Sequence, residues 1–172
     1  MYLSGVNIFI LRHGIAVDPG TPGYEHDSDR PLIPKGERRL RSAAAAMEKL
    51  ELSFDLILSG PFIRAKQTAE IVAGELKLKK RIEFFDGLVP GGNSKALIYA
   101  LNELRPEPEN VLLVGHEPYL SRLISLLVSV EPDAAIEMKK GGLCKLEVGE
   151  LRFGECARLA WLLTPSQMEL MA

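Results

Sequence analysis

I-F-I-L-R-H-G, residues 8–14, is a short apolar run that ends in arginine, histidine and glycine. Apolar runs of this length, rich in isoleucine and phenylalanine, are typical of strands buried on both faces of a parallel sheet. Arg12 and His13 then lie at the carboxyl end of the strand. Open α/β sheets bind their ligands at that edge. The stretch therefore predicts an anion site carried by a buried strand.

The rest of the chain alternates predicted strands with predicted helices. Further apolar strands are expected at 55–59, 82–85 and 111–114, and helices at 34–50, 62–76, 94–104 and 120–130. This alternation predicts a three-layer α/β fold, with helices on both faces of a mostly parallel central sheet. Segments 143–148 and 158–164 have no helix between them, which favours an antiparallel pair at or near a sheet edge. Residues 15–33 carry three prolines and little periodicity, and we expect a long loop there.

Composition excludes several classes of protein. The 172 residues fit one domain, 1–172, without a linker, and a formal charge of −2 favours neither nucleic acid nor an anionic membrane as a partner. The most apolar stretch, 120–130, is well short of the ~20 residues of a membrane span. No secretory signal is visible, and neither Cys144 nor Cys156 belongs to a C-x-x-C pair, so we expect a cytoplasmic protein. The three histidines have no metal-ligand spacing, so neither metal nor cofactor is expected.

Unusual residues follow each predicted parallel strand. They are Arg12-His13-Gly14, Ser59-Gly60 with Arg64 one helical turn on, Asp86, and Gly115-His116-Glu117. The exits of parallel strands lie at one edge, so these residues converge. Two arginines and two histidines suit a small dianion such as a phosphoryl group, because one guanidinium group can donate two parallel hydrogen bonds to phosphate oxygens. Neither G-x-x-x-x-G-K-[ST] nor G-x-G-x-x-G is present, so a nucleotide cofactor is not indicated.

Three segments together resemble the motifs of the histidine phosphatase superfamily, which has the phosphoglycerate-mutase-like fold. They are L-R-H-G at 11–14, L-S-x-P-x-x-R-A-x-Q-T-A at 58–69 and V-G-H-E-P at 114–118. The sequences D-R-P-L at 29–32, K-G at 35–36 and L-V-P-G-G at 88–92 are similar to the small branch, the SixA-type phosphohistidine phosphatases. The chain has no stretch long enough for the helical cap of the larger relatives.

The resemblance implies a metal-independent, two-step phosphoryl transfer through a covalent phosphohistidine enzyme. His13 would attack phosphorus, while Arg12, Arg64 and His116 would bind the oxygens. For this, His13 must be neutral at the attacking nitrogen, with a backbone carbonyl holding the proton of the other nitrogen. His116, set among anions, is expected to be charged.

Further candidates for phosphate or substrate binding are Gly14, Ser59, Arg30, Asp86 and Glu117. Arg30, with Lys35, either guides a phosphoprotein or is a plain surface charge. Glu117 either orients His116 or starts the next helix with a favourable charge.

The chain departs from the family pattern at two glycines. Many members carry serine where this chain has Gly60, so a side-chain hydroxyl is absent. The Ser59 hydroxyl or backbone N–H groups would have to donate to the phosphoryl group in its place. The glutamate acid of larger members corresponds to Gly87, with Asp86 beside it as a displaced acid. Loss of the acid favours N–P substrates, because the imidazole leaving group has a conjugate acid of pKa ~6.5.

The sequence thus predicts a phosphohistidine phosphatase acting on a protein partner. A broad small-molecule phosphomonoesterase, with Asp86 as acid, is the alternative enzyme. A non-catalytic phosphoprotein-binding module is the alternative from another class. Strand-end histidines and ion-paired arginines of purely structural role would explain a single histidine, but not the assembled set of residues. A monomer is plausible, but the sequence does not fix the oligomeric state.

Overall fold

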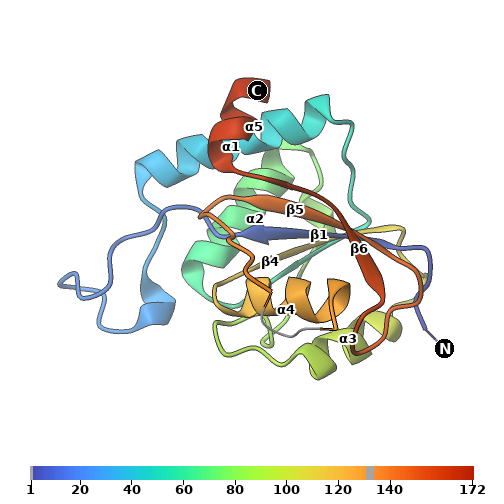
Figure 1. Ribbon diagram of the computed structural model, residues 1–172. Helices are drawn as coiled ribbons and strands as arrows, with labels where there is room; N and C mark the ends of the chain where they lie inside the picture. The colour runs from blue at the N-terminus through green and yellow to red at the C-terminus, as the bar shows by residue number, and fades with distance from the viewer. Residues whose placement is uncertain (1, 131–133) are drawn as a thin grey trace.

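One six-stranded sheet organises the computed structural model, which describes residues 2–130 and 134–172. Its strands lie in the order β3-β2-β4-β1-β5-β6 (Figure 1). Their bounds are β1 Asn7–Arg12, β2 Leu56–Ser59, β3 Ile82–Phe84, β4 Asn110–Gly115, β5 Leu143–Val148 and β6 Ala157–Leu163. The first four strands are parallel, β5 is antiparallel to β1, and β6 is antiparallel to β5. The predicted antiparallel pair therefore closes one edge of the sheet.

Helices cover both faces of the sheet. One face carries α1 (Pro34–Lys49), α2 (Ile63–Glu75) and α5 (Pro165–Met171), and the other carries α3 (Ser94–Asn102) and α4 (Tyr119–Val128) (Figure 1). Side chains of β1 alternate between the two layers, because successive residues of a strand point to opposite faces. Ile8 and Ile10 join the core of α3 and α4, whereas Phe9 and Leu11 join the core of α1, α2 and α5. The predicted three-layer α/β fold is confirmed.

The predicted elements differ from the observed ones mainly at their ends. The first helix was expected to run to Leu50, but α1 ends at Lys49 and Leu50 is its exposed C-cap. Residues 15–33 are a long loop as predicted, interrupted by a 3₁₀ turn, η1 (Asp27–Asp29), and a second turn, η2 (Lys79–Arg81), precedes β3. Ala16 and Leu32 pair as an isolated bridge, which closes the base of the loop.

The parallel strands end together, and this brings the motif residues to one edge. Arg12 lies opposite Gly115 in the β1–β4 register, and the His13 N–H donates to the Gly115 carbonyl at 3.0 Å. On the other side of β4, the Gly60 N–H donates to the Val114 carbonyl at 3.0 Å. Across the described parts of the chain, no helix is long and apolar enough to span a bilayer.

Candidate active site

His13 follows β1 directly and is only 6% exposed. The Arg64 Nε–H lies 3.3 Å from His13 Nε2, and His13 Nδ1 lies 2.7 Å from the Gly14 carbonyl oxygen. An arginine N–H can only donate, so Nε2 is the acceptor and Nδ1 carries the ring proton, which it donates to Gly14. Burial, with Arg64 and Arg12 nearby, lowers the pKa of His13 to about 3. His13 therefore presents a neutral Nε2 lone pair, and the predicted carbonyl partner is that of Gly14.

Arg64 lies in the first turn of α2, and its side chain is 3% exposed. Its two terminal nitrogens donate to the Asp27 carbonyl and, at 2.7 Å, to Asp27 Oδ2. The backbone around Arg64 is fixed by Thr68, whose hydroxyl donates to the Arg64 carbonyl at 2.6 Å. The same Thr68 oxygen accepts the Gly14 N–H at 3.1 Å. Thr68 thus joins the first turns of α2 to the end of β1.

His116 ends the β4 segment and packs between two rings. Its ring centroid is 4.9 Å from that of His13 and 4.9 Å from that of Phe62. Both of its ring nitrogens are buried, and neither has a hydrogen-bond partner among the described residues. Burial, reinforced by Arg64 and Arg12, lowers the pKa of His116 to about 3, although Asp27 opposes this shift. The expectation of a charged His116 is wrong for the structure without a bound anion, because burial, reinforced by Arg64 and Arg12, keeps the pKa of the ring low.

Arg12 is held by the segment that leads into β5. Its Nη1 donates to the Met138 carbonyl at 2.7 Å, and its carbonyl accepts the Gly141 N–H at 3.0 Å. Its Nε is buried without a partner among the described residues. Buried polar groups are normally paired, so Arg12 Nε and the two His116 nitrogens mark where a polar ligand belongs. The Arg12 Nε–H is an unsatisfied charged donor, which suits an anion, and the neutral His116 ring offers one N–H and one lone pair beside it.

Two of the remaining sequence candidates are engaged inside the fold. The Gly14 N–H donates to Thr68 and its carbonyl accepts from His13, so Gly14 orients the His13 ring and its N–H is already engaged. Ser59 is fully buried and its hydroxyl donates to the Gly60 carbonyl at 3.1 Å. Both were expected to bind phosphate, and the structure places their donors elsewhere.

Arg30 is 9% exposed, which excludes a plain surface charge. Its guanidinium donates to the Asp27 carboxylate and to the Val17 carbonyl, so it points into its own loop. Lys35 is exposed on the first turn of α1.

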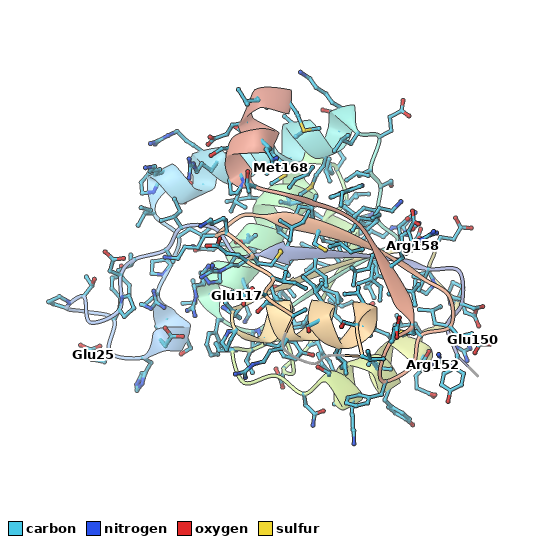
Figure 2. All side chains as sticks on the ribbon, viewed as in Figure 1. Glu25, Glu117, Glu150, Arg152, Arg158 and Met168 are labelled. Atoms are coloured by element: carbon cyan, nitrogen blue, oxygen red, sulfur yellow. The ribbon has the colours of Figure 1, made fainter. Side chains whose placement is uncertain are left out.

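Asp86 and Glu117 make no hydrogen bond or ion pair with His13 or His116 among the described residues. Asp86 is exposed after β3. Glu117 Oε2 accepts the Ser121 hydroxyl at 2.6 Å at the start of α4, near the left end of that helix in Figure 2. Because the His116 nitrogens are unpaired within the described chain, Glu117 does not orient that ring through a hydrogen bond.

Three neighbours of the site were not predicted from the sequence: Phe62, Asp27 and Thr68. Phe62 stacks on His116 and lies 5.2 Å from the Arg64 guanidinium carbon. Phe62 and Thr68 lie inside the quoted 58–69 motif, and Asp27 lies two residues before the quoted D-R-P-L. Phe62 and Thr68 contact residues at the ends of β1 and β4 and in α2, whereas the contacts of Asp27 depend on how the 15–33 loop folds over α2.

The two departures from the family pattern have a steric cause. A Cβ at Gly60 would lie 2.2 Å from the Leu88 carbonyl oxygen, and a Cβ at Gly87 would lie 2.3 Å from the Phe85 ring. The Leu88 backbone therefore leaves no room for a serine at position 60, and a glutamate at position 87 would require the Phe85 ring to move. Within the described residues, no three His, Cys, Asp or Glu side chains form a group that could hold a metal ion.

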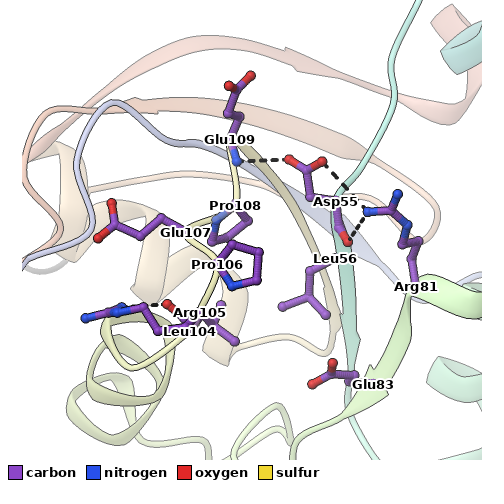
Figure 3. A pocket seen from close by; sticks show the side chains of 10 residues that line it. All are labelled: Asp55, Leu56, Arg81, Glu83, Leu104, Arg105, Pro106, Glu107, Pro108 and Glu109. Atoms are coloured by element: carbon purple, nitrogen blue, oxygen red, sulfur yellow. Dashed lines mark hydrogen bonds and ion pairs between the residues drawn. The ribbon is translucent and has the colours of Figure 1, made fainter.

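A hollow of about 500 Å³ lies at the opposite edge of the sheet, at the amino ends of the parallel strands (Figure 3). It is lined by residues that precede β2, β3 and β4, among them Asp55, Arg81 and Glu109. Asp55 Oδ2 accepts the N–H groups of Glu109 and Asn110 at 2.9 and 3.0 Å. The Asp55 side chain therefore joins the start of β2 to the start of β4.

Comparison with known proteins agrees with this geometry. The model of the histidine phosphatase superfamily (branch 1) matches residues 8–88. The phosphohistidine phosphatase SixA of Escherichia coli is 32% identical over 124 residues, covering 71% of this chain and 74% of that protein. An uncharacterized protein of Picosynechococcus sp. is 35% identical over 148 residues, covering 86% of this chain and 88% of that protein.

Solved structures extend the match to nearly the whole chain. The protein histidine phosphatase SixA complexed with tungstate superposes with a TM-score of 0.81 at 25% identity, covering 94% of this chain and 98% of that one. An α-ribazole-5′-phosphate phosphatase of E. coli, at 18% identity and a TM-score of 0.75, shares the fold. The chain belongs to the histidine phosphatase superfamily and is a phosphatase of the SixA type.

Proposed function

We propose that this protein is a metal-independent phosphohistidine phosphatase that acts on a protein partner. The observation that carries the proposal is the neutral, buried His13, whose Nε2 lone pair faces the Arg64 guanidinium. The unpaired Arg12 Nε and His116 nitrogens lie at the same edge. A nucleophile beside preorganised donors for phosphoryl oxygens is what phosphoryl transfer requires.

In the proposed first step, His13 Nε2 forms a bond to phosphorus as the bond from phosphorus to the substrate imidazole breaks. The substrate imidazole, which carries a proton on its other ring nitrogen, keeps the bonding electron pair and leaves as neutral imidazole. Arg12, Arg64 and His116 bind the three equatorial oxygens, and the arriving dianion raises the affinity of His116 for a proton. In the second step, water attacks the phosphohistidine enzyme, releases phosphate and restores neutral His13.

The carboxylates near the site favour an N–P substrate. Partial burial alone would raise the pKa of Asp27, but hydrogen bonds from Arg30 and Arg64 outweigh it and lower that pKa. Asp27 is therefore ionised and a poor proton donor, and Asp86 is exposed, with no hydrogen bond to either histidine among the described residues. An alkoxide needs a proton to leave, whereas imidazole, with a conjugate acid of pKa ~6.5, needs little help.

A protein partner fits the architecture, because no helical insertion covers the site in the described residues and the E. coli relative is named a phosphohistidine phosphatase. A phosphohistidine carrier of a signal-transduction relay is the proposed substrate class. Cys144 and Cys156 are both free thiols, which fits the proposed cytoplasmic location.

The test incubates wild type, His13→Ala and His26→Ala with a phosphohistidine-bearing carrier protein, with and without a metal chelator. His26 is an exposed histidine outside the site and serves as the matched control. We expect phosphate release by wild type and His26→Ala, none by His13→Ala, and no effect of the chelator.

Two results would contradict the proposal. Faster hydrolysis of aryl or alkyl phosphates than of the carrier would identify a broad phosphomonoesterase. Tight retention of the phosphorylated carrier, without release of phosphate by wild type, would identify a binding module.

A further inference from the structure

Asp27 brings a carboxylate to the guanidinium that the proposed reaction assigns to the phosphoryl group. Asp27 Oδ2 accepts from Arg64 Nη2 at 2.7 Å, and Oδ1 accepts from Arg30 Nε at 2.9 Å. The second terminal nitrogen of Arg64 donates to the Asp27 backbone carbonyl. One carboxylate oxygen and one carbonyl oxygen of Asp27 thus occupy the planar fork that would otherwise bind two phosphoryl oxygens.

The same arginine covers the lone pair of the nucleophile. Arg64 Nε donates to His13 Nε2 at 3.3 Å while its terminal nitrogens contact Asp27. Attack by Nε2 on phosphorus requires that lone pair, so the Nε–H must pass from His13 to a phosphoryl oxygen. The guanidinium cannot make this change without altering its contacts to Asp27, because its planar fork moves as one unit.

Asp27 is also the polar tether of its loop. Among the described residues, the hydrogen bonds and ion pairs that join segment 18–29 to the protein outside the 15–33 loop are those from Asp27 to Arg64. Other bonds of the segment stay within the loop, such as Thr21 to Asp18 and Arg30 to Asp27. Glu25, near the tip, projects away from the body of the protein (Figure 2). Release of Asp27 would free the tip.

We propose that Asp27 is an internal competitor of the phosphoryl group: its carboxylate holds Arg64 against His13 and is displaced when a phosphoryl anion binds, which releases the tip of the 15–33 loop. The competition sets a threshold, since an anion must interact with Arg64 more strongly than the tethered carboxylate does. This inference rests on the proposed function only in naming the phosphoryl group as the displacing anion.

Binding of tungstate, the anion bound in the solved SixA structure, tests the competition without turnover. Calorimetric titration compares wild type with Asp27→Asn, which keeps the shape and the backbone carbonyl but removes the charge. We expect the tungstate Kd of Asp27→Asn to fall by roughly tenfold, the order of one charged hydrogen bond. The matched control is Asp29→Asn, an exposed carboxylate on the same 3₁₀ turn that accepts from Ser28, and its Kd should equal that of wild type.

A weaker or unchanged Kd in Asp27→Asn would overturn the proposal, because a carboxylate that merely positions Arg64 for the anion gives that result. An equal gain in Asp29→Asn would also overturn it, since the effect would then be general charge. If wild type releases no phosphate from the carrier protein but Asp27→Asn binds tungstate tenfold more tightly, the proposed function is refuted and the competition by Asp27 still holds.

If Asp27→Asn does not fold, proteolysis of the wild-type loop tests the proposal instead. A glutamate-specific protease should cut after Glu25 several-fold faster with tungstate than without. Protection by tungstate would show that the loop closes on the anion and would refute the release.

Discussion

The two ends of the parallel strands differ in how their polar groups are used. At the amino ends, Asp55 satisfies the N–H groups of Glu109 and Asn110 around a hollow of about 500 Å³ (Figure 3). At the carboxyl ends, Arg12 Nε and both His116 nitrogens are buried and unpaired within the described chain. The hollow at the amino edge is thus a structural joint, and the candidate active site is recognised by its unsatisfied buried groups. Unmet hydrogen-bonding capacity marks the site of the proposed chemistry.

The sharpest test of this contrast exchanges one arginine at each edge. Arg64→Met should reduce phosphate release by about 10³-fold, because a preorganised donor for the developing charge is lost. Arg81→Met, at the amino edge, removes a guanidinium whose Nη1 donates to the Asp55 carbonyl at 3.1 Å and should leave the rate unchanged. Single-turnover rates measure both. Equal losses at the two edges would refute the assignment of the site.

A second test uses the response of stability to acid. The folded pKa of His13 and of His116 is about 3, below the ordinary value of 6.5, so the unfolded chain takes up protons first as the pH falls. Stability is complete above pH 6.5 and is lost toward pH 3, by about 2 kcal/mol per histidine between pH 7 and 5.

Urea unfolding at the two pH values checks this prediction. His13→Asn and His116→Asn should each remove about 2 kcal/mol of the loss. His26→Asn, at an exposed position, should keep the wild-type response. A wild-type response in all three variants would show that the two histidines titrate normally in the fold.

A third test restores the serine that many relatives carry. Gly60→Ser places a Cβ 2.2 Å from the Leu88 carbonyl oxygen and should destabilise the fold by about 2 kcal/mol through overpacking. Gly91→Ser is the control, because a Cβ there meets nothing within 4 Å. Thermal unfolding measures both. A stable, more active Gly60→Ser variant would mean that the Leu88 segment yields easily.

The smallest effect is expected at the amino edge. Asp55→Ala removes the acceptor of two backbone N–H groups and should cost about 1 kcal/mol, a modest value because the side chain is nearly half exposed. Asp55→Asn keeps an oxygen and should cost less. Neither should change the rate of phosphate release. A loss of activity without a loss of stability would place function at this edge too.

Sequence patterns predicted the layers and the convergence of His13, Arg64 and His116, because buried strands carry long apolar runs and their exits share an edge. They did not predict the contacts of Asp27, since those depend on the path of a loop without periodicity. They also misplaced the donors of Gly14 and Ser59, which internal hydrogen bonds consume. The prediction that His116 is charged was also wrong, because the pKa of the ring depends on its burial, which only the assembled fold determines.

The bridge between Ala16 and Leu32 has a consequence for engineering. It closes the base of the loop independently of what lies between, and the free energy of closing a flexible loop rises by only ~0.6 kcal/mol for each doubling of its length. Extra residues near Gly20 or Gly23, both exposed with positive φ, should therefore be accommodated without disturbing the sheet. A short epitope or fluorescent reporter inserted there would stand beside the catalytic edge, where it could register the arrival of a partner protein.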